Sequence, residues 1–281
     1  VLRDGRHVRT FERLGETTPD ELVRAMVGRD VDAQGAYRAR PLGETALSVQ
    51  GLQGLGLSAP LDLELRRGEI VGLFGLVGAG RTEALNLLSG NRTPKAGRIT
   101  LNGRALPPLN PQKALRAGIG LCPEDRKKEG IVPIASVTDN VNLGARKRFV
   151  IRASAERAYA QSRVTQFRVR TPSVDQRIGN LSGGNQQKAI IGRVLGHDLK
   201  VLLLDEPTRG IDIGAKAEVH EIVRDLAATG VAVLVVSSEM PELLGLCDRI
   251  LVMEGGRLTG DLPRAEATQE RLLELALPRA A

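Results

Sequence analysis

Three short, wholly apolar runs divide the chain, and each is followed by a stretch with helical spacing. The runs lie at residues 70–74 (IVGLF), 201–204 (VLLL) and 231–236 (VAVLVV). Such runs, without polar alternation, are typical of parallel strands that are covered on both faces. The stretches after them, TEALNLLSG, GAKAEVHEIVRDLAATG and PELLGLCDRI, are expected to be helices. This alternation predicts an α/β fold with a doubly wound, mostly parallel sheet flanked by helices.

The stretch 180–212 joins a loop and a helix to the second apolar run. Ser182 is placed to cap a helix whose first turn holds Gly183 and Gly184, although each glycine costs about 1 kcal/mol against alanine in a helix. Stability alone would not select these glycines, but a helix start with bare N–H groups and a hydroxyl binds anions well. The helix is expected to stop at Gly196, after an apolar stripe of Ile190, Ile191, Val194 and Leu195.

Polar residues that suit ligand binding follow the first two apolar runs. Asp205 and Glu206 end the second run, at the carboxyl edge where open α/β sheets place ligands. The segment 75–82 (GLVGAGRT) lies between the first run and its helix, the context of a phosphate loop. Its glycines let backbone N–H groups surround phosphates, and Thr82 can hold Mg²⁺. Arg81 stands where the pattern has lysine. A glycine-rich turn without a ligand is the plainer alternative, but the two carboxylates favour a nucleotide site.

The remaining stretches suggest a subdivided chain. Residues 44–69 show short β-like runs that predict an antiparallel edge sheet, and the Ala- and Arg-rich middle predicts an inserted helical subdomain at about 126–180. VLRDGR at the start resembles VMEGGR at 252–257, and helix signals that begin at Thr18 and Thr268 follow. We therefore expect residues 1–40 to be the end of an upstream domain plus a linker, and residues 41–281 to form one domain. Chance similarity of a short strand and turn is the alternative.

The composition limits the binding partners and the cellular compartment that we expect for this chain. The net charge of +7 invites nucleic-acid or membrane-surface binding, but aromatics make up 2% and tryptophan is absent, which leaves few stacking platforms for nucleic acid. We expect no nucleic-acid partner. Cys122 and Cys247 lack metal-ligand spacing and are expected to be free, partly buried thiols of a reducing compartment. No apolar run approaches the roughly 20 residues that span a bilayer, which favours a cytoplasmic protein.

LSGGNQQK, the phosphate loop and VLLLDEPTRGID together resemble the ATPase domain of ABC transporters. More narrowly, GLFGLVGAGRTE, CPEDRKKEG, LSGGNQQK and SSEMPE are similar to the second half of the tandem ATP-binding subunits of bacterial sugar importers of the ribose, galactose and xylose type. The resemblance covers about 42–276. It implies a P-loop NTPase core with an antiparallel β subdomain and a helical subdomain. In that family two domains sandwich ATP head to tail, so that each phosphate loop meets the other domain's LSGG.

The resemblance also implies roles for individual residues. Asp205 would hold Mg²⁺ through water, Glu206 would polarise the attacking water, and Thr82 and Glu124 would contact the metal. Ser238 stands where the wider family has a histidine at the γ-phosphate. Nucleotide contacts are expected, in one site or the partner site, from Gly75, Gly78, Ala79, Gly80, Arg81, Thr82, Glu83, Glu124, Leu181, Ser182, Gly183, Gly184, Gln186 and Asp212.

Departures from the family pattern fall on one site only. Arginine replaces lysine at position 81, serine replaces histidine at 238, and no aromatic residue lies in 44–71 to stack on adenine. His7, His197 and His220 are expected on the surface or in helices. Losing a positioned proton-handling group costs about 10²- to 10⁴-fold in rate, so we expect a weak site on this domain's own phosphate loop.

The resulting hypothesis is an ATPase half of a sugar importer at the cytoplasmic face of the membrane, using ATP and Mg²⁺. Its partners would be an upstream nucleotide-binding domain of the same chain, transmembrane permease subunits and, indirectly, a periplasmic or lipid-anchored sugar-binding protein. One alternative is a catalytically silent scaffold that only completes its partner's ATP site. Another is a soluble, non-transport ABC protein, which residues 34–43 disfavour because they are too short for a long interdomain arm. The sequence does not identify the sugar.

Overall fold

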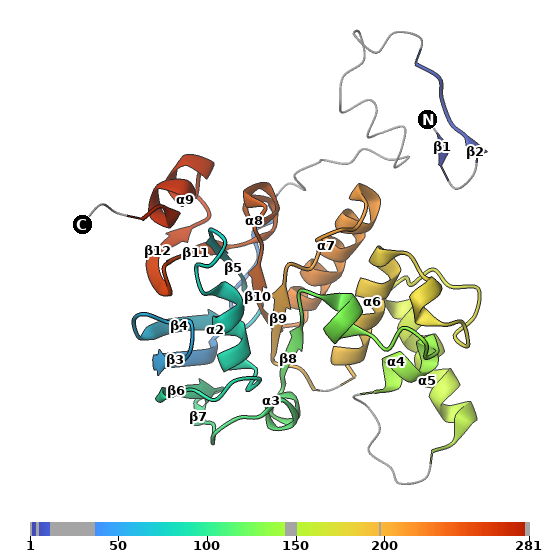
Figure 1. The fold of residues 1–281 in the computed structure, drawn as a ribbon, viewed down its shortest axis with the longest axis horizontal. Coiled ribbons are helices and arrows are strands. Elements are labelled where there is room, and N and C mark those ends of the chain that lie inside the picture. The colour runs from blue at the N-terminus through green and yellow to red at the C-terminus, as the bar shows by residue number, and fades with distance from the viewer. Residues whose placement is uncertain (1, 4–5, 12–36, 144–150, 197, 279–281) are drawn as a thin grey trace.

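A six-stranded, mostly parallel sheet runs through the chain in the computed structural model, which describes residues 2–3, 6–11, 37–143, 151–196 and 198–278 (Figure 1). The strand order is β12-β11-β5-β10-β9-β8, and only β12 is antiparallel to its neighbour. The strands are β5 (Ile70–Gly75), β8 (Ile119–Cys122), β9 (Val201–Asp205), β10 (Ala232–Val236), β11 (Arg249–Glu254) and β12 (Arg257–Pro263). The three apolar runs are therefore the neighbouring strands β5, β10 and β9, as predicted.

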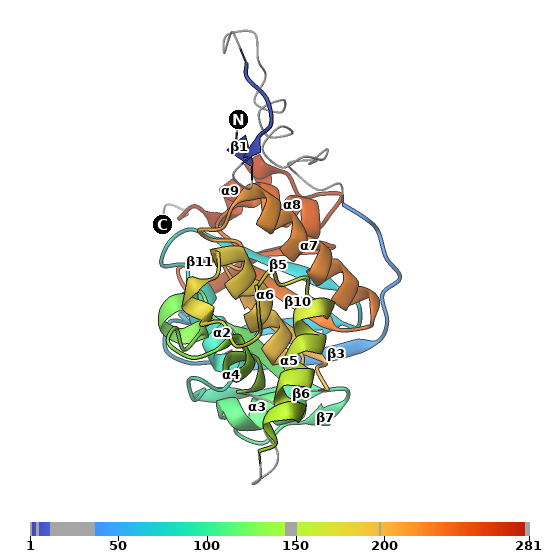
Figure 2. The ribbon, with the colours of Figure 1, turned by 90° about the vertical axis from the view of Figure 1, so that its right-hand side faces the viewer.

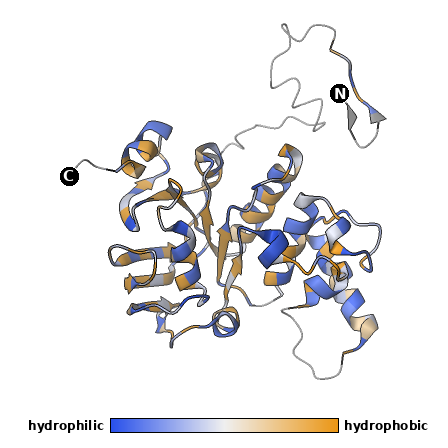
Figure 3. Ribbon diagram, viewed as in Figure 1, coloured by the Kyte–Doolittle hydropathy of each residue, from blue (hydrophilic) through white to orange (hydrophobic). Residues whose placement is uncertain are grey.

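The sheet separates two hydrophobic cores, because alternate side chains of each strand point to opposite faces. Ile70 and Phe74 belong to one core, which is closed by the helices on that face. Val71 and Leu73 belong to the other, which is closed by α2 and a second sheet. Figure 3 shows hydrophobic residues concentrated along the strands. The flanking helices are α2 (Arg81–Leu88), α3 (Pro111–Ala117), α6 (Gly183–Val194), α7 (Ile213–Ala228), α8 (Met240–Leu246) and α9 (Gln269–Ala276).

The second sheet is antiparallel, with the order β4-β3-β6-β7. Its strands are β3 (Thr45–Gln53), β4 (Leu61–Arg66), β6 (Ala96–Leu101) and β7 (Arg104–Ala105). The expected antiparallel sheet at 44–69 is thus present. Strands β6 and β7 were not predicted, and β7 has only two residues, both exposed.

Helices fill the region between β8 and α6, where the sequence predicts a helical insertion (Figure 2). They are the π-helix η2 (Arg126–Gly130), α4 (Val137–Asn142), α5 (Ala153–Gln166) and the short η3 (Ile178–Asn180). Few side chains of α5 are buried, Ala160 and Val164 among them, and these pack into the same core as α6. The exact limits of a subdomain remain a prediction.

The first described residues form two short paired strands. Strand β1 (Leu2–Arg3) pairs antiparallel with β2 (Arg6–His7), in the same order as β11 and β12 around their own turn. The helix expected from Thr18 lies outside the described residues. The assignment of residues 1–40 to an upstream domain therefore stays a prediction.

Two details differ from the sequence prediction. The helix expected over 241–250 ends at Leu246, because the next residues are tied to the sheet: the Asp248 N–H donates to the Ile70 carbonyl at 2.7 Å, and its carboxylate accepts from the Ile70 N–H at 2.8 Å. Both cysteines are free, as expected, but fully buried, and burial raises the pKa of Cys122 to about 12. Among the helices that the structure describes, none combines the length and apolar character needed to cross a bilayer.

Candidate functional site

The segment between β5 and α2 has the backbone that a phosphate loop needs. Gly78 and Gly80 have φ of 82° and 95°, a left-handed conformation that side chains rarely adopt. Space also demands glycine, because a Cβ on Gly80 would lie 2.7 Å from the Gly56 carbonyl oxygen and one on Gly75 would lie 2.6 Å from that of Met253. The loop leads directly into α2, whose first N–H groups suit an anion.

The other predicted contacts of this loop follow from the same geometry. Ala79 is buried, and its N–H donates to the Leu76 carbonyl at 3.0 Å, which closes the loop. Glu83 lies in the first turn of α2 and packs against Gly56, where an added Cβ would lie 2.3 Å from the Glu83 Cγ. Glu83 therefore packs beside Gly56, whose carbonyl lies close to Gly80 of the loop.

Asp205 lies at the end of β9 with 3% of its surface exposed. Burial raises the pKa of this carboxyl to about 6, although a hydrogen bond with the Thr82 side chain opposes the shift. In the part of the chain that the structure describes, the Asp205 Oδ1 is buried and has no hydrogen-bond partner. A hydroxyl beside a carboxylate with a free oxygen is a donor set that suits Mg²⁺. Thr82 and Asp205 therefore fit the metal that the sequence predicts.

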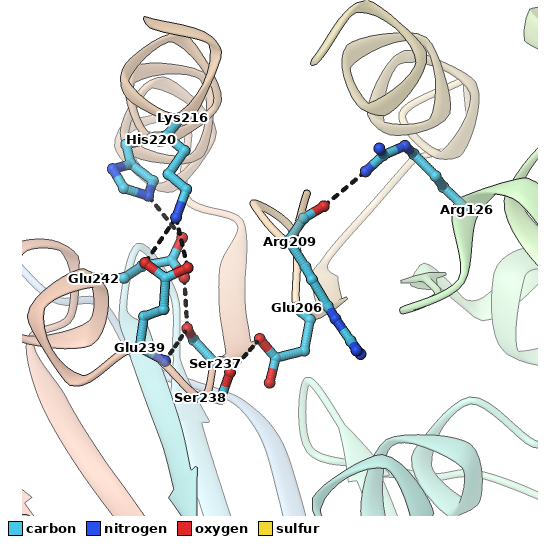
Figure 4. Close-up of polar contacts among 9 residues, drawn as sticks. All are labelled: Arg126, Glu206, Arg209, Lys216, His220, Ser237, Ser238, Glu239 and Glu242. Atoms are coloured by element: carbon cyan, nitrogen blue, oxygen red, sulfur yellow. Dashed lines mark hydrogen bonds and ion pairs between the residues drawn. The ribbon is translucent and has the colours of Figure 1, made fainter. Parts of the chain in front are cut away.

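Glu206 is held by two neighbours. The Arg81 Nη1 lies 3.4 Å from its Oε1, and the Ser238 Oγ donates to its Oε2 at 3.1 Å (Figure 4 shows the second contact). The Glu206 backbone has φ 47°, which is rare for a residue other than glycine. The structure thus brings together the phosphate loop, the carboxylate after β9 and the serine after β10, as predicted. The ion pair between Arg81 and Glu206 was not predicted.

A second carboxylate supports the segment that carries Ser238 (Figure 4). Glu242 accepts hydrogen bonds from the Ser237 Oγ at 2.6 Å and pairs with the His220 Nε2 at 2.7 Å. Burial raises the pKa of Glu242, but the bonds with His220, Ser237 and Thr208 outweigh it, and the pKa is lowered. His220 is thus a helix residue, as expected, that braces this segment. His7 is exposed, and His197 lies outside the described residues.

Glu124, predicted as a metal contact, lies just after β8 and is paired with Arg209. Arg126 also contacts the loop that contains Arg209, because its guanidinium donates to the carbonyls of Arg209 at 2.8 Å and Gly210 at 3.1 Å. A metal contact from Glu124 would require a change of partner. The sequence motif CPEDRKKEG contains Arg126, but nothing in its spacing identifies this role.

The start of α6 is built differently from the prediction. Ser182 occupies the N-cap position, but its side chain makes no capping bond, and instead accepts a hydrogen bond from the Asn185 amide at 2.9 Å. The glycines have a packing reason that the sequence did not reveal: a Cβ on Gly184 would lie 2.3 Å from the Ala215 Cβ, and one on Gly183 would lie 2.5 Å from the Arg126 Nη2. Ser182 is exposed, Gly183 is half-buried and Gly184 is buried.

Two of the predicted nucleotide contacts have buried side chains. Gln186 is 4% exposed, and its amide donates to the carbonyls of Ile178 and Leu181, so it shapes the loop from inside. The Leu181 side chain is also buried. The Gln186 amide thereby ties α6 to η3 and to the residue that follows it. Asp212 stays exposed and caps α7 by accepting from the Ala215 N–H at 2.9 Å.

Most of the predicted residues therefore form two separate groups. One group is the phosphate loop with Asp205, Glu206 and Ser238, and the other lies at the start of α6. Glu124, after β8, and Asp212, at the start of α7, belong to neither group. In Figure 1, α2 and α6 lie on opposite sides of β8 and β9.

Comparison with known proteins accords with this geometry. A family model described as "ABC transporter" matches residues 59–209, more than half of the chain. The chain belongs to the ABC transporter family. This confirms the family that the motifs indicate.

Curated members of the ABC transporter family extend the match. The "Arabinose import ATP-binding protein AraG" of Pseudomonas syringae pv. syringae (strain B728a) is 54% identical over 284 residues, covering 99% of this chain and 56% of that protein. The protein of the same name from Vibrio parahaemolyticus serotype O3:K6 (strain RIMD 2210633) is 49% identical, covering 99% and 56%. The chain thus spans about half the length of the curated relatives it matches.

Solved structures confirm the ABC ATPase fold. A nucleotide-free ATP-binding cassette from an ABC transporter aligns with a TM-score of 0.73 at 17% identity, over 84% of this chain and 100% of that one. A dimeric cassette in a post-hydrolysis state with ADP and Pi aligns with a TM-score of 0.67 at 19% identity, over 78% and 98%.

Proposed function

We propose that the chain is the ATP-binding half of a bacterial sugar importer and hydrolyses ATP to drive transport through a membrane-embedded partner. The observation that carries the proposal is the meeting of the phosphate loop with Asp205 and Glu206 at the carboxyl edge of the sheet. The names of the curated relatives, arabinose import ATP-binding proteins, support a sugar importer. The partners would be permease subunits at the cytoplasmic face of the membrane and, through them, a periplasmic or lipid-anchored sugar-binding protein.

In this proposal the chain's residues divide the chemistry. The N–H groups of the loop before α2 bind phosphates, because the helix dipole and the unpaired donors both favour an anion. Thr82 and Asp205 hold Mg²⁺, which when bound neutralises phosphate charge. Glu206 accepts the proton of the attacking water, and Ser238 orients the Glu206 carboxylate through the hydrogen bond at 3.1 Å.

The start of α6 acts on a different nucleotide. The exposed Ser182, at the N-cap of α6, completes a site whose phosphate loop belongs to a second nucleotide-binding domain. We infer that this second domain precedes the chain in one tandem protein and that residues 1–40 include its end. The antiparallel pairing of β1 with β2, like that of β11 with β12, supports this arrangement. Because arginine stands at position 81 and serine at position 238, where the family pattern has lysine and histidine, this chain's own site would be the weaker of the two.

A silent scaffold is the second candidate, favoured by the Arg81–Glu206 ion pair, which occupies both groups. ATP turnover of the full tandem protein, with the upstream site disabled, separates the candidates. We expect Glu206→Gln to lower the remaining turnover at least about tenfold, because a neutral amide accepts a proton poorly. The exposed Glu270→Gln serves as the charge-matched control. Turnover that is unchanged in both variants would favour the scaffold.

A further inference from the structure

The Arg81–Glu206 ion pair commits the only cation of the phosphate loop to a carboxylate of the same site. The Nη1–Oε1 distance is 3.4 Å, and the two side chains are 11% and 9% exposed. With Ser238 on its other oxygen, Glu206 has both oxygens engaged. Neither the cation nor the carboxylate is free in this arrangement.

We propose that Glu206 sets the nucleotide affinity of this site by holding Arg81. The phosphates of an incoming nucleotide must then displace the Glu206 carboxylate from the Arg81 guanidinium. The inference rests on the proposed function, since it assumes that the loop binds nucleotide phosphates. Phosphate and carboxylate compete for the same guanidinium, because both are oxyanions that match its fork of N–H donors. The observed affinity is then proportional to the fraction of molecules in which Arg81 is not paired with Glu206.

The backbone fixes this pairing. Glu206 keeps its left-handed φ of 47° because its N–H donates to the Val236 carbonyl at 2.9 Å and its carbonyl accepts from the Arg209 N–H at 3.1 Å. Such a conformation persists only where the surroundings enforce it, and it is common at functional sites. The carboxylate is therefore presented to Arg81 by a rigid support rather than by a mobile surface side chain.

A double-mutant cycle on this chain tests the proposal without hydrolysis. ADP binding is titrated by calorimetry for the wild type, Glu206→Gln, Arg81→Gln and the double variant, with and without Mg²⁺. We expect Glu206→Gln to lower the Kd about three- to tenfold, as removal of a competing state should. In the Arg81→Gln background the same change should have little effect, because no ion pair remains to be broken. Glu83→Gln measures the effect of removing a negative charge beside the loop.

Each other outcome decides against the proposal. Equal tightening by Glu206→Gln in both backgrounds would mean that Glu206 simply repels phosphate, and an unchanged Kd would mean that Arg81 serves both groups at once. In either case a wild-type chain that binds ADP leaves the proposed function standing. Absence of binding in every variant, Glu206→Gln included, would overturn both proposals. Thermal unfolding checks that each variant is folded, and Arg81→Lys replaces Arg81→Gln if the latter is not.

Discussion

The phosphate-loop group and the start of α6 are both suited to phosphates, but their charges are arranged in opposite ways. At the phosphate loop, Arg81, Glu206 and Ser238 satisfy one another within the domain. At the start of α6, Ser182 is exposed and makes no capping bond to the helix. The first region thus has an internal competitor for its ligand, whereas the second presents an exposed serine hydroxyl that does not cap its own helix.

Arg126 connects the two regions. Its guanidinium lies against Gly183 at the start of α6 and donates to the carbonyls of Arg209 and Gly210, in the loop that follows Glu206. A change at one region can therefore reach the other through a short run of contacts. Arg81 and Ser238 lie outside these Arg126 contacts, so we expect their departures from the family pattern to weaken the phosphate-loop site without displacing the start of α6.

The largest effect is expected from Ser182→Arg in the full tandem protein. The long side chain would cover the first turn of α6 and block the site on the upstream domain, so ATP turnover should fall about 100-fold or more. Steady-state turnover measures this, with Thr268→Arg, which alters an exposed N-cap elsewhere, as the matched control. Normal turnover in the Ser182→Arg variant would contradict the claim that the start of α6 serves a second nucleotide site.

A smaller loss is expected from Arg126→Ala. Removing the guanidinium frees the carbonyls of Arg209 and Gly210 and leaves space beside Gly183, so turnover of the tandem protein should fall about tenfold through misplacement of both regions. The exposed neighbour Lys127→Ala is the control. We expect kcat rather than KM to carry the loss, and an effect on KM alone would show that Arg126 acts only in binding.

The combined change Arg81→Lys and Ser238→His should raise activity. It restores the residue types that the family pattern has at both positions, so hydrolysis at this chain's own site should rise about tenfold when the upstream site is disabled. Single-site turnover provides the measurement. No gain would place the defect elsewhere, for example in the upstream domain's own signature sequence.

The two regions also differ in how far the sequence predicted them. The apolar runs identified β5, β9 and β10, because buried parallel strands need uninterrupted hydrophobic residues. The strand end placed Asp205 at the carboxyl edge of the sheet, and the phosphate-loop pattern identified Thr82. Ser238 was identified through the family resemblance alone. The pairing of Arg81 with Glu206 could not be predicted, because it depends on the left-handed backbone of Glu206 and on packing between distant segments.

At the start of α6 the sequence identified the element but not its contacts. Ser182 precedes the helix as predicted, yet its hydroxyl bonds Asn185, and Gln186 points inward. The reason for Gly184 is the close approach of Ala215 on α7, a residue 31 positions further along the chain. Local patterns do not contain such contacts between helices.

The smallest effect concerns the pH dependence of stability through Asp205. Its pKa of about 6 in the folded state lies above the unfolded value. Between about pH 4 and 6 the carboxyl is therefore protonated more in the folded than in the unfolded state. The contribution of Asp205 to the free energy of unfolding falls as pH rises through that window. Asp205→Asn should therefore raise the free energy of unfolding by about 1–3 kcal/mol at pH 7.5 and by much less at pH 4.5. Denaturant titrations at the two pH values measure this, and an equal effect at both would show that burial does not shift the group.

The most direct test of the division into two regions is an equilibrium ATP titration of the chain by itself, at concentrations where it is monomeric. Thr82→Ala should weaken binding in the presence of Mg²⁺ about tenfold or more, because Thr82 belongs to the chain's own site. Ser182→Arg should leave the Kd unchanged within about twofold, because the start of α6 serves another nucleotide. Loss of ATP binding in the monomeric Ser182→Arg chain would place Ser182 in the same pocket as Thr82 and contradict the account.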